Sequence, residues 1–240
     1  MRAVRLHADG LRLDELPQPE PGPGDVLVQV HAAAITRDEL TWHTDRLPTI
    51  PSFELSGVME SGDPVFALTP FDREGVLAEY AVVPEDVLAP KPASFSHVEA
   101  AALPMGALTA WQGLVVHGRL QSGERVSITG ASGGVGHLAV QIAESLGATV
   151  VGEGEPCDLL FDTAGRPDGD AERKVSVAEE APGVDYFIVE RDGNQLGEVA
   201  ALGLRPQIDS VFKFEDFADA FARLEQHGKR GKVVVEVAGG

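Results

Sequence analysis

A strand, a glycine-rich turn and a helix follow one another in the stretch Arg125-Val-Ser-Ile-Thr-Gly-Ala-Ser-Gly-Gly-Val-Gly-His-Leu-Ala-Val-Gln-Ile-Ala-Glu-Ser-Leu-Gly147. The apolar strand ends at Gly130, and beyond the turn apolar residues recur at helical spacing up to Leu146. Glycines let the backbone of such a turn approach a pyrophosphate, and the N–H groups at the helix start attract it. We therefore predict a phosphate-binding turn formed by Ala131, Ser132, Gly133, Gly134, Val135 and Gly136.

The rest of the chain divides into a β-rich first part and a mixed second part. Short alternating or β-branched runs, broken by Gly, Pro and Asp, fill the first 93 residues and predict a small all-β unit. Ser96 and Glu99 have the spacing of a capping box, so a helix is expected to begin there. Further helices are expected at 106–116, 194–202 and 217–224, and further strands at 148–151, 158–162, 174–178, 185–189, 208–214 and 232–237.

Acidic residues outnumber basic ones two to one, with 38 Asp and Glu against 19 Lys and Arg in 240 residues. The formal charge of −19 leaves no basic face for phosphate backbones or anionic lipid, so we expect neither nucleic acid nor a membrane as partner. The single cysteine, Cys157, can form no internal disulfide, which is typical of a reducing compartment. Because the first residues lack the apolar core of a signal peptide, we expect a cytoplasmic protein.

Several motifs together resemble the zinc-independent quinone oxidoreductase branch of the medium-chain dehydrogenase/reductase superfamily. They lie at 1–4, 21–28, 80–84, 106–113, 120–126, 130–136 and 230–235. The resemblance implies an α/β protein with a GroES-like substrate domain from residues 1–93 and 205–240 and a Rossmann-like domain from 94–204. It also implies a homodimer that transfers hydride from NAD(P)H to a small-molecule enone or quinone.

The same resemblance places the loop after the long strand at the substrate. Many relatives have Asn where this chain has Thr36, whose hydroxyl would donate a hydrogen bond to a carbonyl oxygen as it gains negative charge. We name Thr36, Glu39, Trp42 and Glu54 as catalytic candidates, with Trp42 as an apolar wall for a flat substrate. Turn capping by Thr36 and core packing by Trp42 are the alternative interpretations. Zinc-dependent relatives place Cys near Thr36 and His at Phe53, so no metal site is expected.

The resemblance also assigns residues beyond the glycine turn to the cofactor. Asp162 and Thr163 match a strand end over the nicotinamide ribose, and Phe187 lies in the segment that contacts the carboxamide. Thr109 lies on a helix that approaches the cofactor in relatives, and Lys232 belongs to the matching tail. For the two strand ends, apolar strands followed by ordinary turns are an equally simple interpretation.

The chain is too short for a complete doubly wound sheet. Only five residues, 152–156, lie between Val151 and Cys157, and they span at most ~18 Å, so a βαβ unit is missing there. In the usual strand order the third strand is an edge, so the remaining strands can stay contiguous without it. The other shortened links predict that some strands turn back antiparallel or shrink to extended segments. Glu153 and Glu155 stand where relatives bind adenosine, and two carboxylates repel a 2′-phosphate. The cofactor therefore remains open. It is NADP(H), or NAD(H), which these carboxylates favour, or the chain binds no dinucleotide.

Three functions follow from these observations. The first is NAD(P)H-dependent reduction of an α,β-unsaturated carbonyl or quinone. The second is a cofactor-independent cyclase or isomerase that acts on an enone in natural-product biosynthesis, with Asp38, Glu39 or Glu54 as general base. The third is a non-catalytic binding protein that kept the GroES-like core.

Overall fold

The computed structural model describes residues 1–37, 39–42 and 44–238, so Asp38 lies outside the described residues. The chain forms two compact units, each built from separate segments. The first comprises Met1–Pro104, Arg191–Gly197 and Gln207–Gly240, and the second comprises Met105–Glu190 and Glu198–Pro206. The domain limits expected from the sequence, at 93/94 and 204/205, stay predictions.

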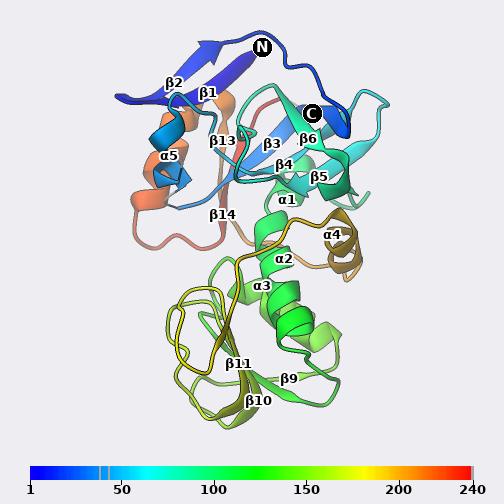
Figure 1. The fold of residues 1–240 in the computed structure, drawn as a ribbon, viewed down its shortest axis with the longest axis vertical. Coiled ribbons are helices and arrows are strands. Elements are labelled where there is room, and N and C mark those ends of the chain that lie inside the picture. The colour runs from blue at the N-terminus through cyan, green and yellow to red at the C-terminus, as the bar shows by residue number, and fades with distance from the viewer. Residues whose placement is uncertain (38, 43, 239–240) are drawn as a thin grey trace. The chain divides into compact units, whose positions relative to one another are not determined.

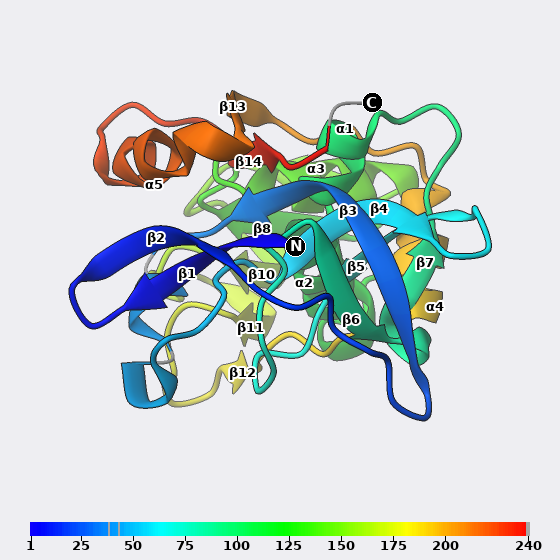
Figure 2. The ribbon, with the colours of Figure 1, turned by 90° about the horizontal axis from the view of Figure 1, so that it is seen from above.

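The first unit is built on β-strands (Figure 1). They are β1 (Arg2–His7), β2 (Gly10–Glu15), β3 (Asp25–Ile35), β4 (Glu54–Met59), β5 (Pro64–Leu68), β6 (Tyr80–Pro84), β7 (Leu88–Pro90), β13 (Ile208–Lys213) and β14 (Lys232–Glu236). One sheet has the order β13-β14-β3-β4-β5-β7, with β6 paired to β3, while β1 and β2 form a separate hairpin. Figure 2 shows β14, β3 and β4 side by side, which brings the chain's last strand next to its longest one.

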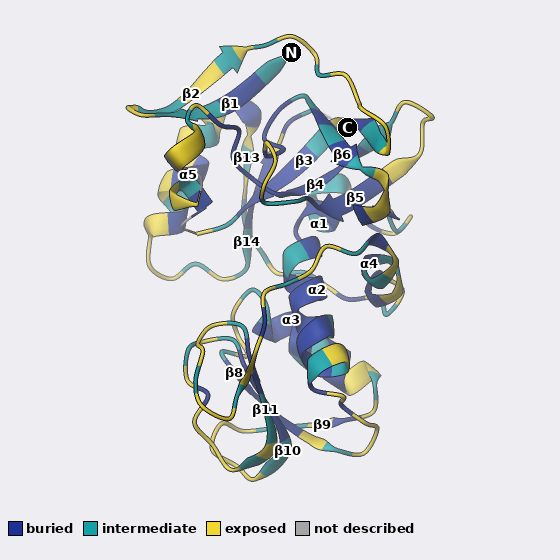
Figure 3. Ribbon diagram, in the orientation of Figure 1, coloured by how far each residue is buried: buried dark blue, intermediate teal, exposed yellow. Residues whose placement is uncertain are grey.

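The core of the first unit lies along β3. Val28 and Val30 are fully buried, as their alternation in the sequence predicts, and Figure 3 shows the central strands in the colour of buried residues. Helix α5 (Phe217–Glu225) buries Phe221 and Leu224 in the same core. The short helix α1 (His97–Ala101) begins with the predicted capping box of Ser96 and Glu99, which is confirmed.

The second unit contains a five-stranded sheet in the order β12-β11-β10-β8-β9. Its strands are β8 (Arg125–Thr129), β9 (Thr149–Val151), β10 (Cys157–Asp162), β11 (Ala171–Ser176) and β12 (Asp185–Tyr186). Its helical segments are α2 (Pro104–Trp111), a π-helical turn at Gln112–His117 and α3 (Gly136–Ser145), of which Pro104 alone belongs to the first unit. Helix α4 (Gly193–Ala200) is divided between the units, with 193–197 in the first and 198–200 in the second. The expected contiguity of the strands after loss of an edge is confirmed.

All strand pairs of this sheet are parallel, so the expectation that some strands turn back antiparallel is wrong. The reason is the shortness of the strands. Val151 pairs with Ser127 and Leu159 with Val126, so the link 152–156 crosses β8 and returns by only a few residues. With this offset, five residues in extended form reach across one strand to the start of β10. The expected shortening of strands to extended segments is confirmed in β12, which has 2 residues.

Within the described ranges, no helix has the length and apolar composition that a membrane span requires.

Candidate active site

The register of the first unit's sheet brings three polar side chains together at the end of β3. Val233 pairs with Ile35 in antiparallel β14, and Glu54 pairs with Ala34 in β4, so Lys232 and Glu54 both lie next to Thr36. The Lys232 ammonium donates hydrogen bonds to Thr36 Oγ1, at 3.0 Å, and to the Glu54 carboxylate. Lys232, which the resemblance assigns to the cofactor, thus contacts two of the catalytic candidates.

Glu39 completes this group, and it is buried with only 4% of its surface exposed. It begins the 3-10 turn Glu39–Thr41, and its Oε2 accepts a hydrogen bond of 3.0 Å from the backbone N–H of Thr36. Its Oε1 is buried and forms no hydrogen bond within the described part of the chain. Burial raises the pKa of Glu39 to about 8, against the opposing effects of the Thr36 N–H and the Lys232 charge. Glu39 therefore carries a proton at neutral pH.

Trp42 belongs to an aromatic cluster in the same unit. Its ring stacks on Phe53 at 6.0 Å between centroids and meets the ring of Phe71 edge-on at 5.5 Å. The Arg191 guanidinium lies 5.3 Å from the Phe71 centroid, a cation–π distance. Trp42 is 38% exposed, so it is not a fully packed core residue. Sequence reasoning missed Phe71 and Arg191, because neither belongs to a motif and both are remote from Trp42 in the chain.

The glycine turn of the second unit has the geometry of an anion site. A Cβ on Gly136 would lie 2.1 Å from the carbonyl oxygen of Gly130, so only glycine fits where α3 begins. The backbone N–H groups of Ala131, Ser132 and Gly134 have no hydrogen-bond acceptor within the described residues. They stand just before α3, where the helix dipole favours negative charge. The turn therefore fits the phosphates of a nucleotide cofactor.

The corner beside this turn is occupied by the chain's own carboxylates. Glu153 Oε1 accepts hydrogen bonds of 3.2 Å from the backbone N–H of Gly130 and from the guanidinium of Arg166. Glu155 pairs with Arg125 at 3.2 Å and accepts a bond from the Gly152 N–H. The two carboxylates expected from the sequence are thus each paired with an arginine.

Asp162 ends β10 as a buried carboxylate that joins three strands. It accepts hydrogen bonds from the hydroxyls of Thr129 on β8 and Ser176 on β11, and from the backbone N–H groups of Ala164 and Arg166 at 3.0 Å. Although burial opposes ionisation, these hydrogen bonds lower the pKa of Asp162. The hydroxyl of the next residue, Thr163, donates to the carbonyl of Thr129 at 2.7 Å. Ser176 was missed by sequence reasoning, since a serine within a strand carries no motif.

The two other cofactor candidates lie on elements that border this sheet. Thr109 is 5% exposed on α2, and that helix approaches the glycine turn closely, because a Cβ on Gly106 would lie 3.0 Å from the carbonyl oxygen of Gly134. Phe187 follows β12, and its ring stacks on His117 at 4.2 Å. Its backbone N–H donates to the carbonyl of Ser176, which fixes the segment against β11.

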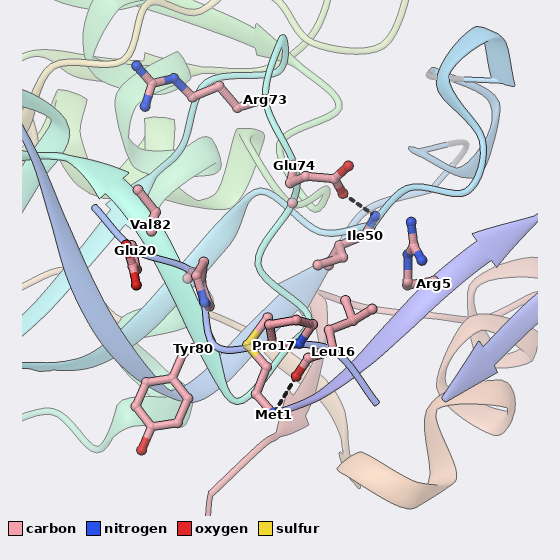
Figure 4. A pocket seen from close by; sticks show the side chains of 13 residues that line it. Met1, Arg5, Leu16, Pro17, Glu20, Ile50, Arg73, Glu74, Tyr80 and Val82 are labelled. Carbon is pink, nitrogen blue, oxygen red and sulfur yellow. Dashed lines mark hydrogen bonds between the residues drawn. The ribbon is translucent and has the colours of Figure 1, made fainter. Parts of the chain in front are cut away.

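A cavity of about 450 Å³ lies elsewhere in the first unit (Figure 4). Met1, Leu16 and Tyr80 line it, together with Arg73 and Glu74, but none of the four catalytic candidates does. Two of its polar groups bond within the fold, since Met1 N donates to Leu16 O at 2.6 Å and the Ile50 N–H donates to Glu74 at 2.7 Å. Among the described residues, no three His, Cys, Asp or Glu side chains come close enough to hold a metal ion.

Comparison with known proteins identifies related sequences over nearly the whole chain. The family described as zinc-binding dehydrogenase matches residues 135–235. A protein of Arthroderma benhamiae named "Probable zinc-binding oxidoreductase, mitochondrial" is 28% identical over 311 aligned positions, which cover 96% of this chain and 94% of that protein. The alignment is longer than the 240 residues of the chain, so the relative contains segments that this chain lacks.

Two further relatives are informative by their names. The 2-methylene-furan-3-one reductase of Solanum lycopersicum is 28% identical over 88% of this chain and 71% of its own length. The solved structure of a quinone oxidoreductase from Thermus thermophilus, reported with its NADPH complex, is 29% identical with a TM-score of 0.81. That comparison covers 99% of this chain and 100% of the other.

Proposed function

Because the chain is a quinone oxidoreductase-like member of the medium-chain dehydrogenase/reductase superfamily, we propose that it reduces an α,β-unsaturated carbonyl or a quinone by hydride transfer without a metal. As an oxidoreductase of this superfamily it combines a GroES-like with a Rossmann-like domain. The observation that carries the proposal is the glycine turn, where three N–H groups without an acceptor among the described residues stand at the start of α3 and fit a nucleotide phosphate. When bound, the nicotinamide ring supplies the hydride.

The substrate carbonyl is assigned to Thr36. A hydroxyl that donates to the carbonyl oxygen stabilises the negative charge which develops there when hydride reaches the β-carbon. Lys232 and the end of β3 hold the Thr36 side chain in place. Trp42, with Phe53 behind it, offers an aromatic surface to a planar substrate.

Replacement of Thr36 by valine tests this role. Thr36→Val removes the hydroxyl and keeps the shape, so kcat should fall roughly tenfold, about 1.4 kcal/mol of transition-state stabilisation. Thr36→Ser retains the hydroxyl and is the matched control. Steady-state rates of NADH or NADPH oxidation with 1,4-benzoquinone measure the effect. Equal kcat values for the valine and serine variants would show that the Thr36 hydroxyl takes no part in the reaction.

We propose NADH as the preferred cofactor. Glu153 lies at the first N–H of the glycine turn, where its carboxylate accepts from a free ribose hydroxyl and repels a 2′-phosphate. The positive charge of its partner Arg166 is balanced by this ion pair. In Glu153→Ser, Arg166 becomes available to a 2′-phosphate, so the ratio of kcat/KM for NADH to that for NADPH should fall roughly tenfold.

The matched control for that change is Glu155→Ser. Glu155 is also paired with an arginine in the same link, but its partner Arg125 lies at the other end of β8 from the turn. The cofactor ratio of this variant should equal that of the unaltered protein. A wild-type preference for NADPH, or an unchanged ratio in Glu153→Ser, would contradict the assignment.

The activity itself is tested by oxidation of NADH and NADPH with 1,4-benzoquinone and with 1-octen-3-one, alongside titration of both cofactors against protein fluorescence. We expect turnover with at least one acceptor and saturable cofactor binding. Absence of binding for both cofactors at millimolar concentration would overturn the proposal, and cofactor-free conversion of the enone would favour a cyclase or isomerase. Cytoplasmic location and the homodimer remain predictions.

A further inference from the structure

The group around Thr36 contains one buried ammonium between two buried carboxylates. Glu54 is fully buried, Glu39 is 4% exposed, and the side chain of Lys232 is 12% exposed. They come from three separate segments, since Glu54 begins β4, Lys232 begins β14 and Glu39 follows β3. Thr36 is half-buried.

Burial fixes the number of protons in this group. Two ionised carboxylates beside one ammonium would leave an uncompensated negative charge in the interior, which is energetically expensive. Glu54 has the ammonium as its direct partner, whereas Glu39 accepts a hydrogen bond from the backbone N–H of Thr36 and is also stabilised by the backbone of Ser52. Glu39 is therefore the carboxyl that keeps a proton, and the raised pKa of about 8 agrees with this assignment.

The hydrogen bonds also have a fixed direction. An ammonium only donates, so in the contact of 3.0 Å Lys232 donates and Thr36 Oγ1 accepts. The single hydroxyl proton of Thr36 must then point to a different acceptor. A proton that leaves Thr36 toward a substrate oxygen can be replaced at once from Lys232.

We propose that Lys232 supplies the proton of the reduction through Thr36, and that neutral Glu39 keeps the group in the state that releases it. This inference rests on the proposed function. Addition of hydride to the β-carbon moves the electron pair of the carbon–carbon double bond onto the carbonyl oxygen as an enolate. Thr36 transfers its hydroxyl proton to that oxygen, Lys232 transfers an N–H proton to Thr36, and the products are an enol and a neutral amine that solvent reprotonates. Lys232 acts through Thr36 and is a positioning residue.

Ionisation of Glu39 should stop this transfer. A carboxylate at position 39 adds negative charge beside the ammonium, which then holds its proton more tightly. Among the described residues, Glu54 from β4 and Lys229 from the segment before β14 also act on the ammonium, and Lys229 in turn lies near Arg37. Burial, followed by the positive charges of Arg37 and Lys232, lowers the pKa of Lys229. Turnover should therefore decline as the pH rises through about 8.

Glu39→Gln tests the charge state, because glutamine imitates the neutral carboxyl. We expect this variant to lose the alkaline decline of kcat, with 1,4-benzoquinone and 1-octen-3-one as probes. Stability to urea gives a readout that needs no cofactor. The folded state retains the Glu39 proton up to about pH 8, while the unfolded chain loses it near pH 4, so wild-type stability should fall as the pH rises between these values and fall less in Glu39→Gln.

Lys232→Arg and the double variant Lys232→Met/Glu54→Gln test the proton supply. Arginine keeps the charge but does not give up a proton, and the double variant has no ammonium at position 232. In both variants kcat should therefore fall roughly tenfold with little change in KM. The double variant leaves no unpaired charge behind and should fold. Full kcat in Lys232→Arg, or an unchanged alkaline limb in Glu39→Gln, would each overturn the inference. No turnover in the wild type with either cofactor would instead overturn the proposed function, and the urea series would still measure the proton on Glu39.

Discussion

Asp162→Ala should destabilise the protein by about 2–4 kcal/mol, because the substitution leaves the buried hydroxyls of Thr129 and Ser176 without their acceptor. Both hydroxyls are almost completely buried, so water cannot replace the carboxylate. Unfolding by urea, followed by circular dichroism, measures the loss. The affected residues end β8, β10 and β11, so we also expect weaker cofactor binding at the neighbouring glycine turn.

The pH dependence of this effect has a definite sign. The folded-state pKa of Asp162 is lowered, so its stabilising contribution is complete above the pKa of an unfolded aspartate, about 4, and disappears as the pH falls through the folded value. The difference between the wild type and Asp162→Asn should therefore shrink below pH ~4. Asp168→Asn, at an exposed position of the next loop, is the control and should change stability by less than about 0.5 kcal/mol. Equal stabilities of the two asparagine variants at pH 7 would contradict the role of Asp162.

Gly136→Ala should destabilise the protein by about 2–3 kcal/mol and weaken nucleotide binding. Helix propensity alone predicts the opposite, since alanine in a helix is favoured over glycine by about 1 kcal/mol. Packing decides the sign, because the new Cβ would lie 2.1 Å from the carbonyl oxygen of Gly130 and 2.8 Å from the Cα of Ala131, and a backbone cannot yield as a flexible side chain does.

Gly134→Ala is the matched control for stability. A Cβ at this position meets no atom within 4 Å, and its φ lies outside the left-handed range. Its melting temperature should stay close to that of the wild type, whereas that of Gly136→Ala should fall by roughly 4–12 °C. A melting temperature of Gly136→Ala at or above the wild-type value would show that the turn relaxes without loss.

Local patterns predicted local structure well. The capping box at Ser96, the turn at 130–136 and the helix that ends before Gly147 are all present, because each depends on interactions within one or two helical turns. The resemblance named Thr36, Glu39 and Glu54 as one site, and the structure places them in contact or near contact through Lys232. The sequence also indicated the missing βαβ unit, from the length of the link 152–156 alone.

Long-range order needed the tertiary structure. Thr36 and Lys232 are separated by 196 residues, and only the antiparallel register of β14 on β3 places the ammonium at the hydroxyl. The parallel course of the shortened sheet depends on strand lengths and pairing, which short links in the sequence do not reveal. The sequence by itself determined the turn, the caps and the family resemblance, because these are written in neighbouring residues. The proton on Glu39 and the pairing of Glu153 were decided by burial and by contacts between distant segments, which exist only in the folded chain.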